Sequence, residues 1–224
     1  MNLASARTNM IKQQLRTWDV LDDAVLQLIE SVAREQFVPS QYHNLAYADV
    51  SIPLANGQMM LSPKIEGHIL QAVQIKHTDN VLEVGTGTGY LTTLIAKQAK
   101  YVTSVDIDVQ MIKLADSHLK KLLISNVSFE QGYAEQDWPS EENYDVIILS
   151  GSVPNVPEKL KNRLSIGGRL FAIIGTTAAM VATLMTRASR EQFISKPLFD
   201  THVKALAQEQ ATDPFVFNDD KEGK

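Results

Sequence analysis

A short apolar strand that runs directly into a glycine-rich turn constrains this chain more than any other feature. Residues 81–90 read Val-Leu-Glu-Val-Gly-Thr-Gly-Thr-Gly-Tyr, and a helical pattern follows. Glycine permits a tight turn and lets backbone amides come close to a ligand. The glycines are spaced G-x-G-x-G, and Tyr90 stands where a dinucleotide-binding turn has its third glycine or an alanine. The pattern therefore favours a nucleoside cofactor other than a dinucleotide.

Strand and helix patterns alternate from Asp79 onward. Short apolar runs predict buried strands, and helical spacing of apolar residues predicts the helices between them. This alternation predicts an α/β, Rossmann-like fold, with a mainly parallel sheet and helices on both faces. The predicted strands are 81–84, 101–105, 127–130, 144–149 and 169–174, and the predicted helices are 90–99, 108–122 and 158–164.

The segments on either side of this pattern are less regular. Helices are predicted at 7–17 and 22–34, followed by a long ordered loop at 42–60. Ser62 precedes Pro63, which predicts a helix that begins at Pro63 with the serine side chain as its N-cap. Towards the other end, residues 181–185 and 214–217 are compatible with strands, and their order in the sheet cannot be read.

Composition excludes several classes of function. The chain has 21 Lys and Arg against 26 Asp and Glu, and a net charge of −5 argues against nucleic acid as a partner. There is no cysteine, and the five histidines lack metal-ligand spacing, so we expect no metal. No apolar run near residue 1 resembles a signal peptide, so we expect a cytoplasmic location. The uncharged stretch 170–186 is interpreted as two buried strands joined by a turn, and we expect no membrane association.

Two acidic residues complete the pattern around the glycine turn. Glu83 precedes the first glycine, and Asp106 ends the next strand. A carboxylate at the end of that second strand can accept both ribose hydroxyls of a nucleoside. This arrangement is typical of Rossmann-like methyltransferases that bind S-adenosyl-L-methionine; the alternative is a purely structural turn with Glu83 in a salt bridge. The candidate cofactor-binding residues are Glu83, Gly85, Thr86, Gly87, Gly89, Asp106, Ile107 and Tyr133.

Further stretches of the chain match landmarks of a known family; they are residues 36–39 (Gln-Phe-Val-Pro), 45–49, 52–54, 57–58, 144–148, Pro154, Pro157 and 167–170. Together with the glycine turn, they make the chain from about Met10 to Ile174 resemble the protein-L-isoaspartate O-methyltransferase family. The resemblance implies methyl transfer from S-adenosyl-L-methionine to the free carboxylate of L-isoaspartyl residues in damaged proteins. Such a carboxylate is already ionised at neutral pH, so the reaction needs no general base.

The loop after Gln58 departs from the family pattern. Leu61 stands where the family has its active-site serine, and Ser62 lies one position later. We interpret Ser62 as a helix cap and only a weak catalytic candidate, while Gln58, Met59 and Leu61 form a substrate-side loop. Tyr133 stands in Gly-Tyr-Ala where the family has Gly-Asp-Gly. Three functions therefore remain open: isoaspartyl methylation, methylation of another protein or small-molecule acceptor, and S-adenosylmethionine binding without catalysis.

The predicted organisation has three parts. Residues 1–78 form an N-terminal helical extension that ends in the substrate-side loop, residues 79–217 form the Rossmann-like S-adenosylmethionine-dependent methyltransferase domain, and residues 218–224 form a disordered polar tail.

Overall fold

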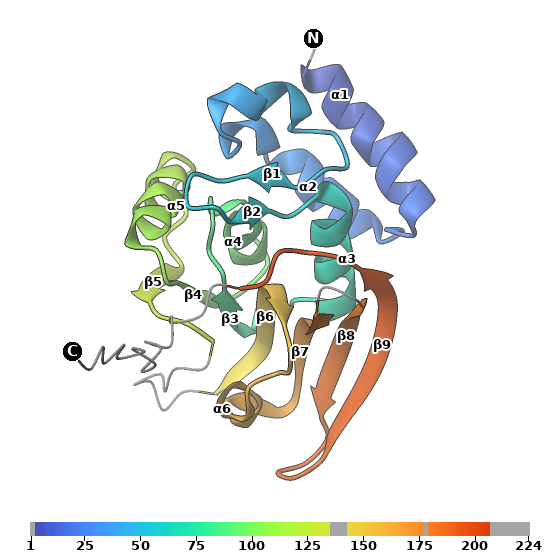
Figure 1. Cartoon of the computed structure of the whole chain (residues 1–224), viewed down its shortest axis with the longest axis vertical. Helices are drawn as coiled ribbons and strands as arrows, with labels where there is room; N and C mark the ends of the chain where they lie inside the picture. Colours follow the sequence, from blue (N-terminus) through green and yellow to red (C-terminus); the bar gives the residue numbers. More distant parts are fainter. Residues whose placement is uncertain (1–2, 135–142, 177–178, 207–224) are drawn as a thin grey trace, which may run out of the picture.

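A seven-stranded sheet forms the centre of the molecule (Figure 1). The structure is a computed structural model, and it describes residues 3–134, 143–176 and 179–206. The strand order is β5-β4-β3-β6-β7-β8-β9; β3 to β7 run parallel to one another, and β8 is antiparallel to both of its neighbours, β7 and β9. The predicted mainly parallel sheet is confirmed. The strands span Asn80–Val84 (β3), Tyr101–Asp106 (β4), Val127–Gln131 (β5), Tyr144–Val153 (β6), Leu164–Thr176 (β7), Ala179–Arg187 (β8) and Phe193–Thr201 (β9).

Alternate residues of the central strands enter two separate hydrophobic layers. Val81 and Ile148 belong to one layer, whereas Leu82 and Ile147 belong to the other. The first layer also receives side chains from the N-terminal helices, α3, α4 and α5, and the second receives Leu160 of α6. Burial on both faces explains why these strands are almost continuously apolar. The bounds of the helices around the sheet are Pro63–Val73 (α3), Tyr90–Ala96 (α4), Val109–Lys121 (α5) and Glu158–Asn162 (α6).

The N-terminal segment has more helix at its start, and less later, than the sequence predicts. The helix predicted at 7–17 is a continuous series of turns made of α1 (Leu3–Asn9), a π-helix (Met10–Leu15) and a 3₁₀ turn (Arg16–Trp18). The helix predicted at 22–34 is shorter and is α2 (Asp23–Ser31). The Asp22 side chain accepts hydrogen bonds from the first amides of α2, and the backbone becomes extended at Val32.

Two short elements interrupt the segment predicted as a loop at 42–60. A 3₁₀ helix spans Ser40–Leu45, and a small hairpin pairs β1 (Ile52–Pro53) with β2 (Met59–Met60). Both elements are too short to produce a countable period in the sequence. The hairpin leads directly into α3, so it fixes where residues 59–61 lie relative to the sheet.

Helix α3 begins at Pro63 as predicted, but the predicted capping by the Ser62 side chain is wrong. The Ser62 backbone is extended and its carbonyl accepts the Glu66 amide at 3.1 Å, yet its side chain makes no cap hydrogen bond. Pro63 already holds the φ angle required at the first helical position, so the helix begins without the hydroxyl.

The sequence predicts the end of the sheet only in part. Strand β8 contains the predicted residues 181–185, whereas β9 is a strand that the sequence reasoning missed. Most β9 side chains are exposed or half-buried, so they show no apolar period. The predicted strand at 214–217 and the predicted tail at 218–224 lie outside the described residues. The stretch 170–186 contributes to β7 and β8, and no described helix is long and apolar enough to span a membrane.

Candidate functional site

A cavity lies at the carboxyl ends of β3, β4 and β6, where the strand connections change direction across the sheet. Its empty space is about 670 Å³, including the part that is open to solvent. This edge is where open α/β sheets bind their ligands. Its walls come from the β1–β2 hairpin, the glycine turn, the ends of the strands and a segment near residue 205. Its lining residues include Gln58, Met59, Leu61, Gly85, Gly87, Asp106, Ile107, Tyr133 and Lys204.

The glycine turn is held against β4 by its own backbone. The amides of Gly85 and Thr86 both donate to the Val105 carbonyl, at 2.7 and 3.1 Å. Gly85, Gly87 and Gly89 all have positive φ angles, which other residues rarely adopt. The turn between β3 and α4 therefore needs glycine for its backbone conformation.

The three glycines differ in what a side chain would meet. A Cβ atom at Gly85 would lie 2.2 Å from the Ser150 Oγ atom, and one at Gly89 would lie 2.8 Å from the Ala115 Cβ atom. At Gly87 the nearest atom would be Leu54 Cδ1, at 3.8 Å. A Cβ at Gly87 would thus extend into open cavity space, which is the space that a ligand held by this turn would use.

Asp106 connects the turn to the end of β4. One carboxylate oxygen accepts the Gly87 amide and the other accepts the Asp108 amide, both at 2.9 Å. The side chain lines the cavity although the residue is only 8% exposed. Burial raises the pKa of Asp106, and the hydrogen bonds from the backbone oppose this rise. An acceptor at this position suits the hydroxyl groups of a ribose.

Three of the predicted cofactor-binding residues do not line the cavity. Glu83 is buried beneath the turn, where one oxygen accepts the hydroxyls of Thr92 (2.5 Å) and Ser104 (2.7 Å). Burial raises the pKa of Glu83 to about 7. The Thr86 hydroxyl also pairs with Ser104, and Gly89 packs against α5. These placements favour a role in shaping the turn over direct contact with a cofactor.

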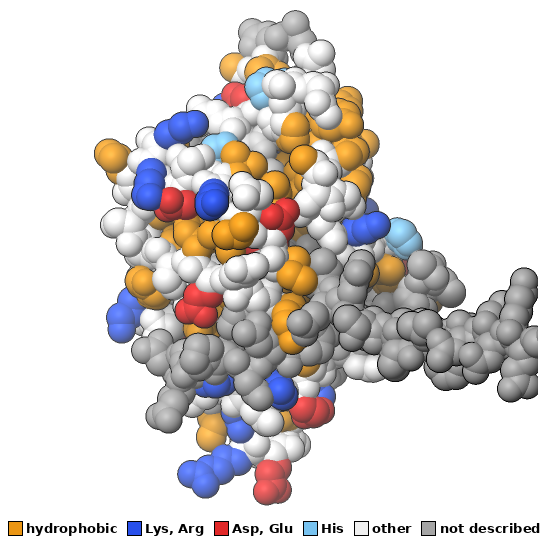
Figure 2. Space-filling view, turned by 60° about the vertical axis from the view of Figure 1, so that its left-hand side comes forward, with side chains coloured by type: hydrophobic (Ala, Val, Ile, Leu, Met, Phe, Trp, Pro, Cys, Tyr) orange, Lys and Arg blue, Asp and Glu red, His pale blue; other side chains and the backbone are white. Residues whose placement is uncertain are grey.

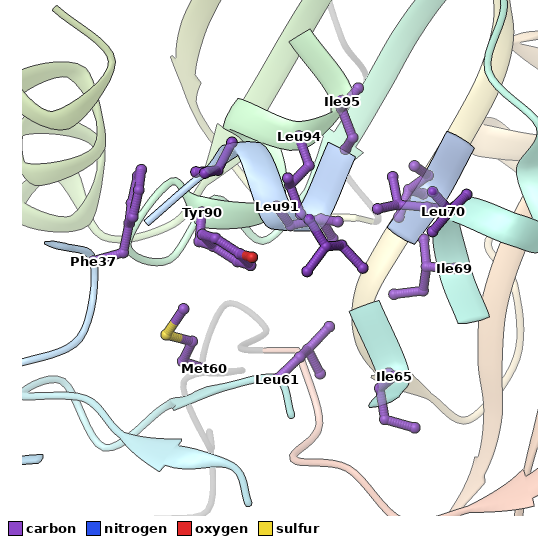
Figure 3. Close-up of a cluster of buried hydrophobic side chains, with 14 of the residues drawn as sticks. Phe37, Met60, Leu61, Ile65, Ile69, Leu70, Tyr90, Leu91, Leu94 and Ile95 are labelled. Atoms are coloured by element: carbon purple, nitrogen blue, oxygen red, sulfur yellow. The ribbon is translucent and has the colours of Figure 1, made fainter. Parts of the chain in front are cut away.

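The substrate-side loop forms the opposite wall of the cavity. Gln58, Met59 and Leu61 line it, as the sequence predicts for a loop that faces the site. Leu61 is only 8% exposed, and it packs with Met60 among hydrophobic side chains of α3 and α4 (Figure 3). The Tyr90 side chain from α4 extends towards this pair (Figure 3). Ser62 is also buried, does not line the cavity, and so is not brought to the site as a catalytic hydroxyl.

A buried ion pair behind the loop is a feature that the sequence reasoning missed. The Arg34 guanidinium contacts the Glu66 carboxylate and donates to the Leu61 carbonyl at 2.5 Å. It also lies 4.8 Å from the centre of the Tyr90 ring. Arg34 and Glu66 are 1% and 2% exposed. The pair joins the 3₁₀ turn at 34–36 to α3 and fixes the backbone of the loop at Leu61.

The second missed feature is a short segment that crosses the end of β6. We call residues 203–206 the strap. The Ser152 amide donates to the Lys204 carbonyl at 3.1 Å, and the Leu206 amide donates to the Ser152 carbonyl at 3.0 Å. A Cβ atom on Gly151 would lie 3.0 Å from backbone atoms of the strap, so glycine permits this close approach. The strap completes the cavity wall on the β6 side.

Comparison with known proteins agrees with this geometry. The family model described as protein-L-isoaspartate(D-aspartate) O-methyltransferase matches residues 5–210. The chain belongs to this family. Protein-L-isoaspartate O-methyltransferase 1 of Rhodopseudomonas palustris (strain HaA2) is 32% identical over 206 residues, covering 92% of this chain and 84% of the relative. The Koribacter versatilis enzyme of the same name is 36% identical over 170 residues, covering 76% and 77%.

Solved structures agree on the fold. A protein-L-isoaspartate O-methyltransferase from Plasmodium falciparum, in complex with S-adenosyl-L-homocysteine, superimposes with a TM-score of 0.78 at 22% identity. The superposition covers 92% of this chain and 99% of that one. The predicted Rossmann-like methyltransferase fold, the membership of the family and the dependence on S-adenosylmethionine are confirmed.

Proposed function

We propose that this chain transfers a methyl group from S-adenosyl-L-methionine to the free carboxylate of L-isoaspartyl residues in damaged proteins. One observation carries the proposal: the glycine turn, Asp106, and the loop at Gln58 and Met59 line a single cavity. A cofactor held by the turn and a side chain entering past the loop would therefore meet in the same space.

The residues present suit this cofactor. Gly87 leaves open space in front of the turn, and Asp106 offers acceptors for ribose hydroxyls at the end of β4. Ile107 and Tyr133 line the same end of the cavity, where a nucleobase would lie. When bound, S-adenosylmethionine supplies an electrophilic methyl group on a sulfonium centre. The protein contributes by aligning the acceptor and by excluding water.

The hairpin side of the cavity is apolar, which suits the exclusion of water. Leu54, Met59 and Leu61 give the hairpin side an apolar wall that excludes water. The acceptor carboxylate arrives already ionised at neutral pH, because its ordinary pKa is near 4. No side chain has to remove a proton, so the lack of a serine hydroxyl at position 61 does not remove a general base.

The surface is consistent with a protein substrate. On the face shown in Figure 2, isolated charges of both signs lie among hydrophobic side chains, and the described residues of that face form no broad basic patch. Together with the net charge of −5, this favours a peptide segment over nucleic acid as the partner.

Methyl transfer to synthetic peptides tests the proposal. Labelled S-adenosylmethionine is incubated with a peptide that contains L-isoaspartate and, as controls, with the L-aspartyl and isoasparaginyl peptides of the same sequence. We expect label in the L-isoaspartyl peptide alone, with strong loss in Asp106→Ala. That variant should also bind S-adenosyl-L-homocysteine about 10- to 100-fold more weakly, because it loses charge-assisted hydrogen bonds.

A second candidate function follows from Met59 and Leu61. These side chains make the acceptor side more apolar than a loop with hydroxyl groups would be. If the purified enzyme binds S-adenosylmethionine but leaves every isoaspartyl peptide unmethylated, a different protein or small-molecule acceptor replaces the first proposal.

A further inference from the structure

The cavity has two ends that differ in charge. Asp106 lies at the end of β4, and Lys204 lies on the strap beside β6. Strand β3 separates β4 from β6 in the sheet. Two strand spacings amount to about 10 Å, so these two charged groups occupy different sides of the site. Among the described lining residues, Asp106 and Lys204 are the charged ones.

The backbone of Lys204 is held in place while its side chain stays exposed. The Lys204 carbonyl accepts the Ser152 amide, and the strap is fixed again two residues later through Leu206. Val203 is buried and anchors the strap from the other side. Within residues 3–134, 143–176 and 179–206, no carboxylate forms an ion pair with the Lys204 ammonium group. A positive charge is thus carried at the rim of an otherwise apolar part of the cavity.

We propose that the Lys204 ammonium group recognises the carboxylate of the methyl acceptor on the β6 side of the cavity. This inference rests on the proposed function, because that function places the nucleoside near Asp106 and the acceptor beyond the glycine turn. Leu61 forms the other wall there and offers no hydrogen-bond donor from its side chain. An ammonium group on the strap supplies the attraction that a hydroxyl on the loop would otherwise supply. Lys204 therefore determines which acceptor binds. It has no part in proton transfer, because the acceptor carboxylate is already ionised.

A carboxylate near Lys204 has two possible sources, the acceptor and the amino-acid end of S-adenosylmethionine. Separate binding measurements distinguish them. Calorimetry first gives the Kd of S-adenosyl-L-homocysteine for the wild type and for Lys204→Met. The protein saturated with S-adenosyl-L-homocysteine is then titrated with an L-isoaspartyl peptide and with its isoasparaginyl analogue, which lacks the negative charge.

We expect the wild type to prefer the L-isoaspartyl peptide, with an affinity that falls as NaCl is raised from 50 to 300 mM, concentrations over which screening strengthens. Lys204→Met should weaken that peptide about three- to tenfold and remove the preference and the salt dependence, as expected for a partly exposed ion pair. Lys204→Arg should keep both. Lys100→Met removes the same charge from an exposed residue before β4, at the opposite end of the sheet, and should bind like the wild type.

Three results would overturn the assignment: an unchanged peptide Kd in Lys204→Met, a loss confined to S-adenosyl-L-homocysteine, or a wild type that prefers neither peptide. Methyl-transfer rates separate this inference from the proposed function. If the wild type methylates the isoaspartyl peptide and Lys204→Met does so with the same KM, the function stands and the role of Lys204 falls. If binding of the peptide depends on Lys204 but no methyl group is transferred, the role of Lys204 stands and the proposed function falls.

Discussion

Removing Arg34 and removing Glu66 should each lower the free energy of unfolding, and the two losses should change in opposite directions with pH. Both side chains are buried, and burial raises the pKa of Glu66 to about 7 although Arg34 lowers it in part. An arginine stays charged throughout the accessible range, whereas a glutamate can take up a proton. Replacing each residue in turn by methionine therefore leaves two different partners behind: a permanent charge, or a carboxyl group that can become neutral.

The magnitudes follow from linkage. The unfolded chain has an ordinary Glu66 pKa near 4.5 and the folded chain one of about 7, so the folded state holds the extra proton between these values. This contribution to stability is present below pH 4.5 and is lost as the pH rises through 7. Between pH 5 and pH 8 the loss amounts to about 2–3 kcal/mol. Glu66→Met removes this titration and leaves Arg34 buried without its carboxylate, at a cost of about 3–5 kcal/mol at pH 8, where Glu66 is ionised.

The cost of Glu66→Met should therefore shrink by about 2–3 kcal/mol between pH 5 and pH 8, which corresponds to about 4–12 °C in Tm for a chain of this size. Arg34→Met raises the pKa of Glu66 further. The loss in free energy of unfolding that this substitution causes should therefore be constant up to pH 7 and then grow by about 1.4 kcal/mol per pH unit. Thermal unfolding of the wild type and both variants at pH 5, 7 and 8 measures this. If the loss of stability changes with pH in the same way for both variants, the reasoning is refuted.

Three further predictions concern the turn and the start of α3. Burial raises the pKa of Glu83 to about 7 in the folded protein, so part of the wild type's free energy of unfolding is lost as the pH rises from 5 to 8. In Glu83→Gln this loss should be smaller by about 2–3 kcal/mol; equal losses in thermal melts of both proteins would contradict this. Gly87→Ala should abolish binding of S-adenosyl-L-homocysteine in calorimetry, while Gly167→Ala, which has a similar positive φ and open space, should cost similar stability and bind normally. Ser62→Ala should change the free energy of unfolding by less than about 0.5 kcal/mol in urea titrations and leave methyl transfer intact, because the hydroxyl caps nothing; a large loss of activity in the folded variant would make Ser62 functional.

The sequence predicts the central strands well because burial on two faces leaves a strong local signal. Val81 to Val84 is apolar except for Glu83, and its turn is recognisable from the glycines alone. Strand β9 leaves no such signal, since its residues are exposed or half-buried and form no hydrophobic face. Among the described strands it pairs with β8 alone, so its position depends on a neighbour rather than on its own composition.

The candidate site is predictable where a local motif or the end of a predicted strand marks its residues, as it does for the glycine turn and for Asp106. Gly85 and Gly87 belong to one turn, and the sequence places them at the cavity. Arg34 and Glu66 are 32 positions apart, and Lys204 reaches the site through a strap that follows the last described strand. No local pattern marks these residues, because their roles arise from tertiary contacts. Glu83 is adjacent to the turn in sequence, but its side chain is buried beneath the turn and does not line the cavity.

Strand β9 also affects how copies of the molecule meet one another. As the outermost strand among the residues that the structure describes, it presents backbone groups on which a strand of another molecule could pair. Pro197 has no amide hydrogen to donate, Lys196 and Asp200 place charges along the strand, and the register shifts at Ala182/Thr183 of the neighbouring β8. Together these features interrupt the regular ladder that intermolecular pairing needs. The polar and proline residues that give β9 no recognisable strand pattern therefore also protect the folded protein against edge-to-edge aggregation.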